Sequence, residues 1–129
     1  MPSDAAKSSL DIEAQELSDK AVVDAILAAH AAGVAVRVMV DGPTSTSPSE
    51  VAVIAKLKAA GVPLRTSKDL DLHAKCIVVD EQTVFVGSQN MTSTAFTQNR
   101  EVGVITNDKA QASKVRAVIA GDFDQGSDL

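Results

Sequence analysis

The first half of the chain alternates short apolar runs with segments that begin and end like helices. Ser18 is a candidate N-cap for a helix that stops before Gly33, and Ser47 opens a capping-box sequence, with Pro48 at the first helical position, for a helix that stops before Gly61. The apolar runs have the length of strands and cover residues 10–14, 34–40 and 62–66. This β-α-β-α-β order favours strands joined by right-handed crossovers.

The second half of the chain continues with strands that lie closer together. The segments predicted there are strands at 72–79 and 83–86, a polar loop or short helix at 87–100, a strand at 101–106, and a last helix capped by Asn107 with Ala112, Val115, Val118 and Ile119 inward. Most apolar residues are Ala and Val, and the three aromatic residues are all Phe, a composition typical of buried strands covered by helices. The expected fold class is α/β, an α/β/α sandwich with a mixed, largely parallel sheet.

The length of 129 residues indicates a single domain. We expect it to span residues 10–121, between a flexible N-terminal tail (1–9) and a C-terminal tail (122–129). No apolar run reaches the roughly 18 residues of a membrane span, and the N-terminus does not resemble a secretion signal. The localisation stays open, with the cytoplasm as default and a secreted or membrane-associated location if the chain is part of a longer protein. The single cysteine, Cys76, excludes an intrachain disulfide and is expected to be a buried, inert thiol.

The net charge of −5 argues against a protein that grips nucleic acid over a broad basic surface. The charge is uneven, because residues 37–75 hold six Lys and Arg against four acidic residues. A focused positive site on an acidic body suits a small anionic group such as one phosphate. The alternative is an ordinary mixed surface in contact with solvent.

The stretch from Leu72 to Asn90, LHAKCIVVDEQTVFVGSQN, holds the residues most informative about chemistry. Alternate residues of a strand point to the same face, so His73 and Lys75 are expected to project together. A nucleophilic imidazole beside a fixed cation, with hydroxyl and amide donors nearby, is the set of groups needed to attack a phosphodiester.

The spacing His73-x-Lys75-x4-Asp80-x6-Gly87-Ser88-x-Asn90 resembles the HKD signature of the phospholipase D superfamily. Three further segments resemble that family: AAGVAVRVMV, AGVPLR and NREVGVI. The resemblance covers nearly the whole chain and implies a phospholipase D-like fold. It also implies catalysis through a phosphohistidine at His73, with no metal and no cofactor.

The phosphate is expected to be held by side chains around the imidazole. Lys75 offers a point charge to the non-bridging oxygens, and the hydroxyl of Ser88 and the amide of Asn90 donate hydrogen bonds to the same oxygens. Gly87 is expected to permit close approach of the backbone at the site.

Two acidic residues, Glu101 and Asp80, each have two alternative roles. Glu101 matches the family glutamate that accepts a hydrogen bond from the other ring nitrogen of the catalytic histidine; the alternative is an exposed charge at a strand start. Asp80 is included among the catalytic candidates, but its place at a turn, on the other face from His73, equally fits a structural residue that bonds the Glu81-Gln82 turn. His30, near the end of the first helix, is expected at the surface or as a helix cap.

The mechanism that the resemblance implies needs a second imidazole to protonate the leaving oxygen, and this chain has one such motif. The second histidine would come from another copy of the chain in a symmetric homodimer, or from the other half of a two-motif enzyme. Single-motif nucleases of the family usually carry a helix before the first strand, whereas only nine residues precede Leu10 here. This difference favours the back half of a bacterial phospholipase D-like protein.

Three functions are consistent with the sequence. The leading interpretation is a phosphodiesterase that hydrolyses a phospholipid or transfers its head group, although the absence of Trp and Tyr is unusual for an enzyme acting at a lipid interface. The second is a metal-independent endonuclease acting as a homodimer. The phosphate backbone of a nucleic-acid strand would then lie along the basic residues of the middle third: Arg37, Lys56, Lys58, Arg65 and Lys68. The third is an inactive half-domain that binds only phosphate and a partner.

Overall fold

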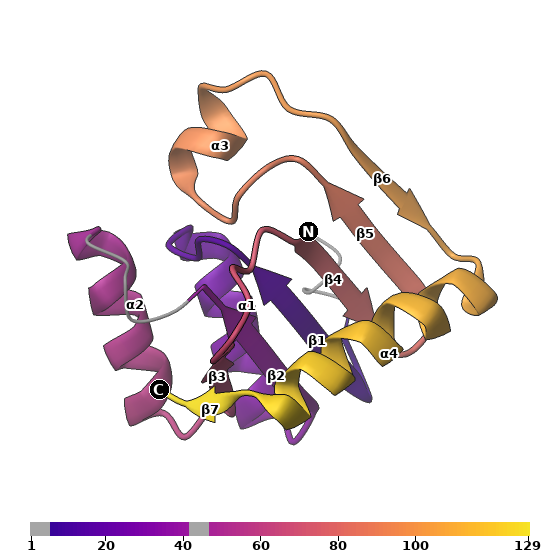
Figure 1. Ribbon diagram of the computed structural model, residues 1–129, viewed down its shortest axis with the longest axis horizontal. Helices are drawn as coiled ribbons and strands as arrows, with labels where there is room; N and C mark the ends of the chain where they lie inside the picture. The colour runs from indigo at the N-terminus through magenta and orange to yellow at the C-terminus, as the bar shows by residue number, and fades with distance from the viewer. Residues whose placement is uncertain (1–5, 42–46) are drawn as a thin grey trace.

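The computed structural model describes residues 6–41 and 47–129. One seven-stranded sheet organises them, with helices on both of its faces (Figure 1). The elements are β1 (Ser9–Ala14), α1 (Lys20–Ala31), β2 (Ala35–Val40), α2 (Pro48–Ala59), β3 (Leu64–Thr66), β4 (Lys75–Val79), β5 (Thr83–Gly87), α3 (Ser93–Thr97), β6 (Gly103–Thr106), α4 (Lys109–Gln125) and β7 (Ser127–Asp128).

The strands lie in the order β6-β5-β4-β1-β2-β3-β7. The α/β/α sandwich and its mixed sheet are confirmed, but the sheet is not largely parallel. Parallel pairing is confined to β1 with β2 and β2 with β3, and the other four pairings are antiparallel. For β4 and β5 the reason is local: a tight turn joins them, and parallel neighbours would need a much longer crossover connection.

The two faces of the sheet bury different cores. On one face, side chains of β1, β2 and α1 form the larger core, with Ile12, Val38 and Ile26 completely buried. On the other face α4 covers β4 and β5, where Ala112 and Ile119 pack against Cys76, Val78 and Val84. In Figure 1, α4 crosses in front of the sheet and α1 lies behind it.

Acidic residues of β1 lie beneath α4. Asp11 is 1% exposed, and its carboxylate accepts hydrogen bonds from Arg37 at 2.6 Å and from Arg116 of α4 at 3.0 Å. Glu13, 2% exposed, lies near Asp122 of α4. Burial, together with the charge of Asp122 and a hydrogen bond to it, raises the pKa of Glu13 to about 7. The interface between β1 and α4 is therefore held by paired charges and by a carboxyl group that binds its proton tightly.

The helix caps lie close to their expected positions. Ser47 caps α2 as predicted, with Pro48 in its first turn. The cap of α1 is Asp19 rather than Ser18, and that of α4 is Asp108 rather than Asn107. In both cases an aspartate one residue later accepts the first free backbone N–H groups, which a carboxylate satisfies as well as a hydroxyl or an amide does.

Both expected tails are corrected by the structure within the described residues. At the N-terminal end, residues 1–5 lie outside the described part, but Ala6 packs against the larger core and Ser9 already belongs to β1. At the C-terminal end, α4 continues to Gln125 and β7 pairs with β3. Arg65 stabilises this end by bonding the Phe123 carbonyl and the Asp128 carboxylate.

One expected core residue is wrong: Val118 on α4 is 60% exposed, because the helix turns that position away from the sheet. Within residues 6–41 and 47–129, none of the helices combines the length and the apolar character that crossing a membrane requires.

Candidate active site

The candidate site lies at one edge of the sheet, where the parallel strands end. Ala14, the last residue of β1, pairs with Lys75, the first residue of β4, so the end of one strand meets the start of its antiparallel neighbour. The loop before β4 is fixed to the end of β2, because the Leu72 N–H donates to the Asp41 carboxylate at 3.1 Å. Ligand sites in α/β sheets lie at this carboxyl edge of the strands.

His73 and Lys75 lie together at this edge, as the sequence predicts, although only Lys75 belongs to a strand. Lys75 Nζ lies 3.2 Å from His73 Nδ1 and donates to the His73 carbonyl at 2.8 Å. The lysine is 7% exposed, whereas the histidine is exposed. A buried stem thus holds the ammonium against an imidazole that solvent or a ligand can reach.

Asn90 lies in the segment of residues 88–91, which crosses the start of β4, where Lys75 lies. The Ser88 N–H donates to the Val102 carbonyl beside β6, while the Met91 N–H donates to the Glu16 carbonyl beyond β1. Since β4 lies between β5 and β1 in the sheet, residues 88–91 must pass over the end of β4 at which Lys75 begins. The topology therefore brings the second part of the motif over the first.

Ser88 and Glu101 bond to one another. The Ser88 hydroxyl donates to Glu101 Oε2 at 2.5 Å and accepts from the Val102 N–H at 3.1 Å, and Asn99 Nδ2 donates to Glu101 Oε1 at 3.4 Å. Glu101 was expected to bond the ring of His73; in this structure its carboxylate bonds Ser88 and Asn99 instead. Glu101 thus links Ser88, the residue that follows β5, to the segment before β6, and Asn99 holds the Glu101 carboxylate in place.

Gly87, the last residue of β5, pairs with Gly103, the first residue of β6. A Cβ at Gly87 would lie 2.9 Å from the Cα of Gly103 and 2.8 Å from the Phe85 ring. Gly103, which the sequence reasoning passed over, is equally restricted, since its Cβ would meet that ring at 2.5 Å. Both glycines are needed for space, and together they allow the strand pair that delivers Ser88 and Glu101.

Asp80 lies at the far end of β4, five residues beyond Lys75 and so roughly 16 Å from it along the strand. Its carboxylate accepts hydrogen bonds from the backbone N–H groups of Lys7, Ser8 and Ser9 at 2.7–3.2 Å. Desolvation raises the pKa of Asp80, but these bonds outweigh it and lower the pKa to about 2. The expected bond to the Glu81-Gln82 turn is replaced by this clasp on the residues that enter β1.

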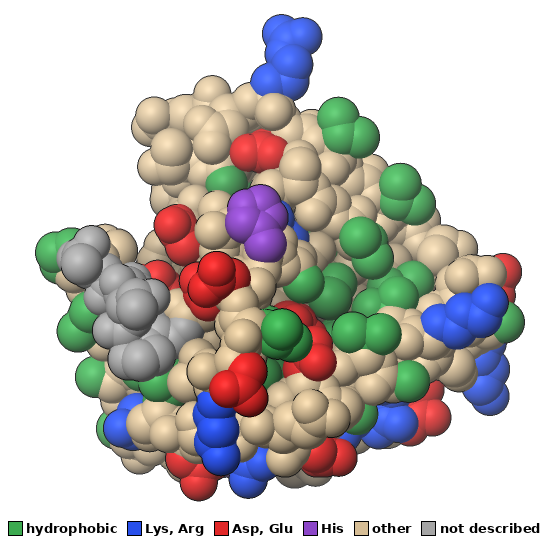
Figure 2. Space-filling view, viewed as in Figure 1, with side chains coloured by type: hydrophobic (Ala, Val, Ile, Leu, Met, Phe, Trp, Pro, Cys, Tyr) green, Lys and Arg blue, Asp and Glu red, His purple; other side chains and the backbone are tan. Residues whose placement is uncertain are grey.

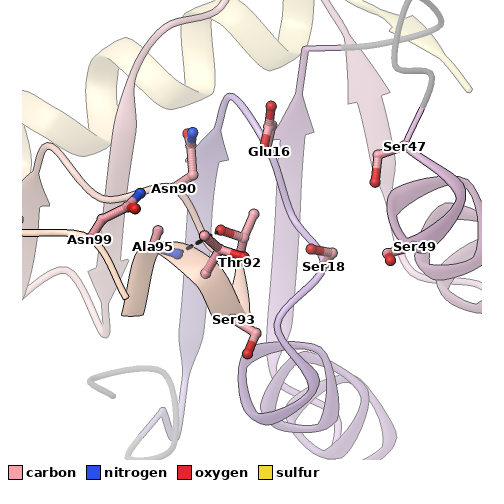
Figure 3. Close-up of a pocket in the computed structure, with 10 residues that line it drawn as sticks. Glu16, Ser18, Ser47, Ser49, Asn90, Thr92, Ser93, Ala95 and Asn99 are labelled. Atoms are coloured by element: carbon pink, nitrogen blue, oxygen red, sulfur yellow. Dashed lines mark hydrogen bonds between the residues drawn. The ribbon is translucent and has the colours of Figure 1, made fainter. Parts of the chain in front are cut away.

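A hollow of about 450 Å³ opens beside Asn90, between the starts of α2 and α3 and the loop after β1 (Figure 3). In Figure 3 the side chain of Asn90, from the segment after β5, and those of Glu16 and Ser18, from the loop after β1, border the same space. Asn90 Oδ1 is buried and has no hydrogen-bond partner. Sequence reasoning missed Glu16 and Ser18, which precede the first helix and carry no local signal of a site.

Three of the five basic residues named in the middle third lie beside acidic side chains rather than at the site. Arg37 pairs with Asp11, Lys56 lies 4.0 Å from Asp24, and Arg65 pairs with Asp128. Figure 2 shows acidic side chains around the exposed histidine of this face, with Lys and Arg gathered mainly toward the margins. The positive charge at the site is therefore local to Lys75.

The part of the chain that the structure describes contains no group of three or more His, Cys, Asp and Glu side chains arranged to hold a metal ion. Cys76 is buried, and desolvation, with the charge of Glu13, raises the pKa of its thiol to about 12. The thiol is consequently protonated and unreactive at neutral pH.

Comparisons with known proteins identify the family to which the chain belongs. The family model described as "Cardiolipin synthase, PLD-like domain" matches residues 4–123. The chain is 34% identical over 109 residues to cardiolipin synthase A of Pseudomonas aeruginosa, covering 81% of this chain and 22% of that protein. It is 35% identical over 104 residues to the mitochondrial cardiolipin hydrolase of Xenopus laevis, covering 80% of this chain and 49% of the hydrolase. The chain thus spans between about a fifth and a half of these relatives' lengths.

Among solved structures, the fold matches Nuc from Salmonella typhimurium, a phospholipase D family member, with a TM-score of 0.91 and 32% identity. The match covers 99% of this chain and 86% of Nuc. A family match over most of the chain and a shared fold lead to the same conclusion: the chain belongs to the cardiolipin synthase, PLD-like domain family of the phospholipase D superfamily.

Proposed function

We propose that this chain is a phosphodiesterase domain that hydrolyses a phospholipid, or transfers its head group, with His73 as nucleophile. The observation that carries the proposal is the exposed imidazole held 3.2 Å from a buried lysine ammonium at the carboxyl edge of the sheet. Lys75 would attract the phosphate oxygens, and the donors of Ser88 and Asn90 would stabilise the charge that develops on them.

The reaction has two balanced steps. A ring nitrogen of His73 forms a bond to phosphorus while the bond to the leaving oxygen breaks, and that oxygen takes a proton from a general acid. Water or an alcohol then attacks the phosphohistidine and gives its proton to the group that acted as the general acid in the first step, while the bond from phosphorus to the imidazole breaks. Hydrolysis and head-group transfer differ only in the second nucleophile.

The proton on the imidazole sets a condition on this scheme. If Nδ1 accepts from Lys75, a neutral ring carries its proton on Nε2, and that nitrogen is not free to attack. Turning Lys75 toward a bound phosphate releases Nδ1 to carry the proton, so that Nε2 becomes the nucleophile. Glu101 is the proposed acceptor for the resulting Nδ1–H. To accept it, the Glu101 carboxylate would have to give up the hydrogen bond that it now receives from Ser88.

The general acid is a second imidazole from outside this chain's motif. A second copy of the chain, or the other half of a longer two-motif enzyme, would supply it. The chain's small share of the cardiolipin synthase length is consistent with the second source.

The test replaces His73→Ala and, as a matched control, His30→Ala, since His30 lies in the last turn of α1. Cleavage of phosphatidylglycerol in mixed micelles and of plasmid DNA is measured with EDTA present. We expect His73→Ala to lose lipid cleavage and the acid-labile phosphoenzyme detected by rapid quenching, with an unchanged circular dichroism spectrum, whereas His30→Ala keeps both. Lipid cleavage that survives in His73→Ala would refute the mechanism. Cleavage of DNA but not lipid would select the endonuclease, and phosphate binding without turnover the inactive half-domain.

A further inference from the structure

The proposed nucleophile lies on a segment outside the strands and helices. Residues 72–74 end the loop that joins β3 to β4, and His73 is exposed in the middle of them. A residue inside a strand or helix is held by the hydrogen bonds of that element, whereas a residue in a loop depends on other contacts to keep its place. The bonds made by this segment therefore decide how firmly the imidazole is held.

The segment crosses the ends of two neighbouring strands. β1 and β2 are parallel, and their last residues, Ala14 and Val40, pair with one another. Gln15 and Asp41 are the next residues of the two chains, so they lie side by side at the carboxyl edge of the sheet. Because the sheet order is β4-β1-β2-β3, the chain that leaves β3 passes over the ends of β2 and β1 before it enters β4.

Each of these two strand ends holds the segment by a hydrogen bond. After β2, the Asp41 carboxylate accepts the Leu72 N–H at 3.1 Å. After β1, the Gln15 N–H donates to the Ala74 carbonyl at 3.1 Å. The two bonds fall on the residues directly before and after His73, so they fix its backbone on both sides. The second bond joins main-chain groups, whereas the first depends on the side chain of Asp41.

The rest of the loop gives the imidazole less support. The Ser67 hydroxyl accepts the N–H groups of Asp69 and Leu70, which closes a turn at the start of the loop, and residues 68–71 are exposed. Leu72, 4% exposed, is the residue at which the loop returns to the core. The bond to Asp41 is therefore made at the point where an exposed loop meets the sheet, one residue before His73.

This hydrogen bond also gives a reason for a carboxylate at an edge where a phosphate is expected to bind. A negative charge there opposes the binding of an anion, because like charges repel. Accepting an N–H does not require the charge, however, since the oxygen of a side-chain amide is an acceptor as well. The two properties of Asp41 can therefore be separated by substitution.

We propose that Asp41 is a positioning residue for the nucleophile. By accepting the Leu72 N–H, it holds the His73 ring where Nδ1 lies 3.2 Å from the Lys75 ammonium. The inference rests on the proposed function, because it takes His73 as the group that attacks phosphorus. It adds a residue that acts through the backbone of the loop and makes no contact with the phosphate.

Three variants separate the hydrogen bond from the charge. Asp41→Ala removes the acceptor, and Asp41→Asn keeps an acceptor oxygen while it removes the charge. Asp71→Ala is the matched control, because it removes an exposed carboxylate directly before Leu72 and leaves the bond to Asp41 in place.

Turnover and phosphate binding are measured for each variant. Asp41→Ala should lower kcat for phosphatidylglycerol in mixed micelles by about 10–100-fold, because a misplacement of about 1 Å can cost about 10²-fold in rate. Inorganic phosphate, followed by isothermal titration calorimetry, should bind no more weakly, since Lys75 is fixed by the pairing of β4 with β1. Asp41→Asn and Asp71→Ala should keep kcat close to that of the wild type.

Nuclear magnetic resonance follows the position of the imidazole without turnover. The chain has two histidines, so His30→Ala assigns both sets of ring signals. Asp41→Ala should speed amide hydrogen exchange at Leu72 and move the ring nitrogen shifts of His73 toward those of a free histidine, while the amides of β4 stay protected. Asp41→Asn should leave the exchange and the ring signals as they are in the wild type.

The outcomes distinguish this inference from the proposed function. If Asp41→Asn loses turnover as Asp41→Ala does, the charge is required and the positioning role is wrong. Unchanged ring signals in Asp41→Ala, or a loss of protection throughout β4, would overturn it as well. A wild type that does not cleave the lipid would refute the proposed function, and the exchange at Leu72 and the His73 signals would still decide whether Asp41 holds the imidazole.

Discussion

Two residues of this chain show how burial changes the behaviour of a charged side chain. Lys75 is buried where it touches an exposed imidazole, and its ammonium lies within hydrogen-bond distance of the His73 carbonyl and ring. Glu13 is buried beneath α4 beside a second carboxyl group. The first arrangement positions a charge for a ligand, and the second favours the neutral form of an acid.

The pKa of Glu13 predicts a pH dependence of stability. Its folded-state pKa of about 7 lies above the ordinary 4.5, so the folded chain binds this proton more tightly than the unfolded chain does. The stabilising contribution is complete below about pH 4.5, declines as the pH rises, and is lost above about 7. The loss should be on the order of 1–3 kcal/mol.

Urea denaturation of the wild type and of Glu13→Gln at pH 5 and pH 8 checks this. From pH 5 to pH 8 the wild type should lose unfolding free energy relative to Glu13→Gln, because only the wild type has the carboxyl group that ionises. Glu16→Gln, at an exposed position of the loop after β1, serves as the control and should not shift it. A pH-independent difference for Glu13→Gln would contradict the assignment.

At the scale of elements, the two ends of β4 have different roles, one at the candidate site and one in holding the fold together. Its first residue, Lys75, faces the candidate site, and Asp80, just past its last residue, holds the segment entering β1. The sequence predicted a strand from 72 to 79, but β4 starts only at Lys75 because the preceding residues bond Asp41 and the end of β1 rather than forming a ladder. His73 still meets Lys75, since alternate residues of an extended chain project to the same side.

Asp80→Ala should destabilise the fold without removing a catalytic group. The carboxylate receives charge-assisted bonds from three backbone N–H groups, and their loss should cost on the order of 1–3 kcal/mol in unfolding free energy. In the wild type this contribution is present above about pH 4 and is lost as the pH falls through the folded-state pKa of about 2. Chemical denaturation at pH 7 and pH 3 measures both effects. Equal stability of wild type and variant at pH 7 would rule out the clasp.

The hairpin of β5 and β6 depends on its two facing glycines. Gly103→Ala should destabilise the fold, because its Cβ would meet the Phe85 ring at 2.5 Å, and should loosen the contact between Ser88 and Glu101. Gly121→Ala is the matched control: that glycine lies within α4 with open space around its Cβ position, and alanine there should stabilise by about 0.5–1 kcal/mol. Opposite shifts in urea midpoint are the expected result, and a neutral Gly103→Ala would show that β6 can move away.

At the scale of the whole molecule, the sequence predicted the sandwich well because strand and helix periods follow from local patterns of small apolar residues. It predicted the directions of the strands less well. β3 pairs parallel with β2 and β4 pairs antiparallel with β1, but no local sequence pattern distinguishes a strand of the first kind from one of the second. In the candidate site, too, some residues are indicated by a local sequence pattern and others are not. The motif spacing predicts that His73, Lys75 and Asn90 share a site, whereas Glu16 and Ser49 reach the hollow only through the tertiary arrangement.

The need for a second imidazole predicts how activity depends on concentration. If a second copy supplies the general acid, turnover per chain should rise with protein concentration and level off as sedimentation velocity shows a dimer. General acid catalysis typically contributes about 10²–10⁴ in rate, so dilution should nearly abolish activity. Turnover per chain that stays constant while the protein is monomeric would require an acid within the chain.

The clasp that Asp80 makes on residues 7–9 changes how genetic data on this motif should be interpreted. An allele that removes these hydrogen bonds should be temperature-sensitive, because cooling offsets a modest loss of folding stability. An allele that removes the proposed nucleophile should be inactive at every temperature. Alleles of Asp80 should therefore recover in the cold and alleles of His73 should stay null, so that permissive temperature separates the two ends of one short strand.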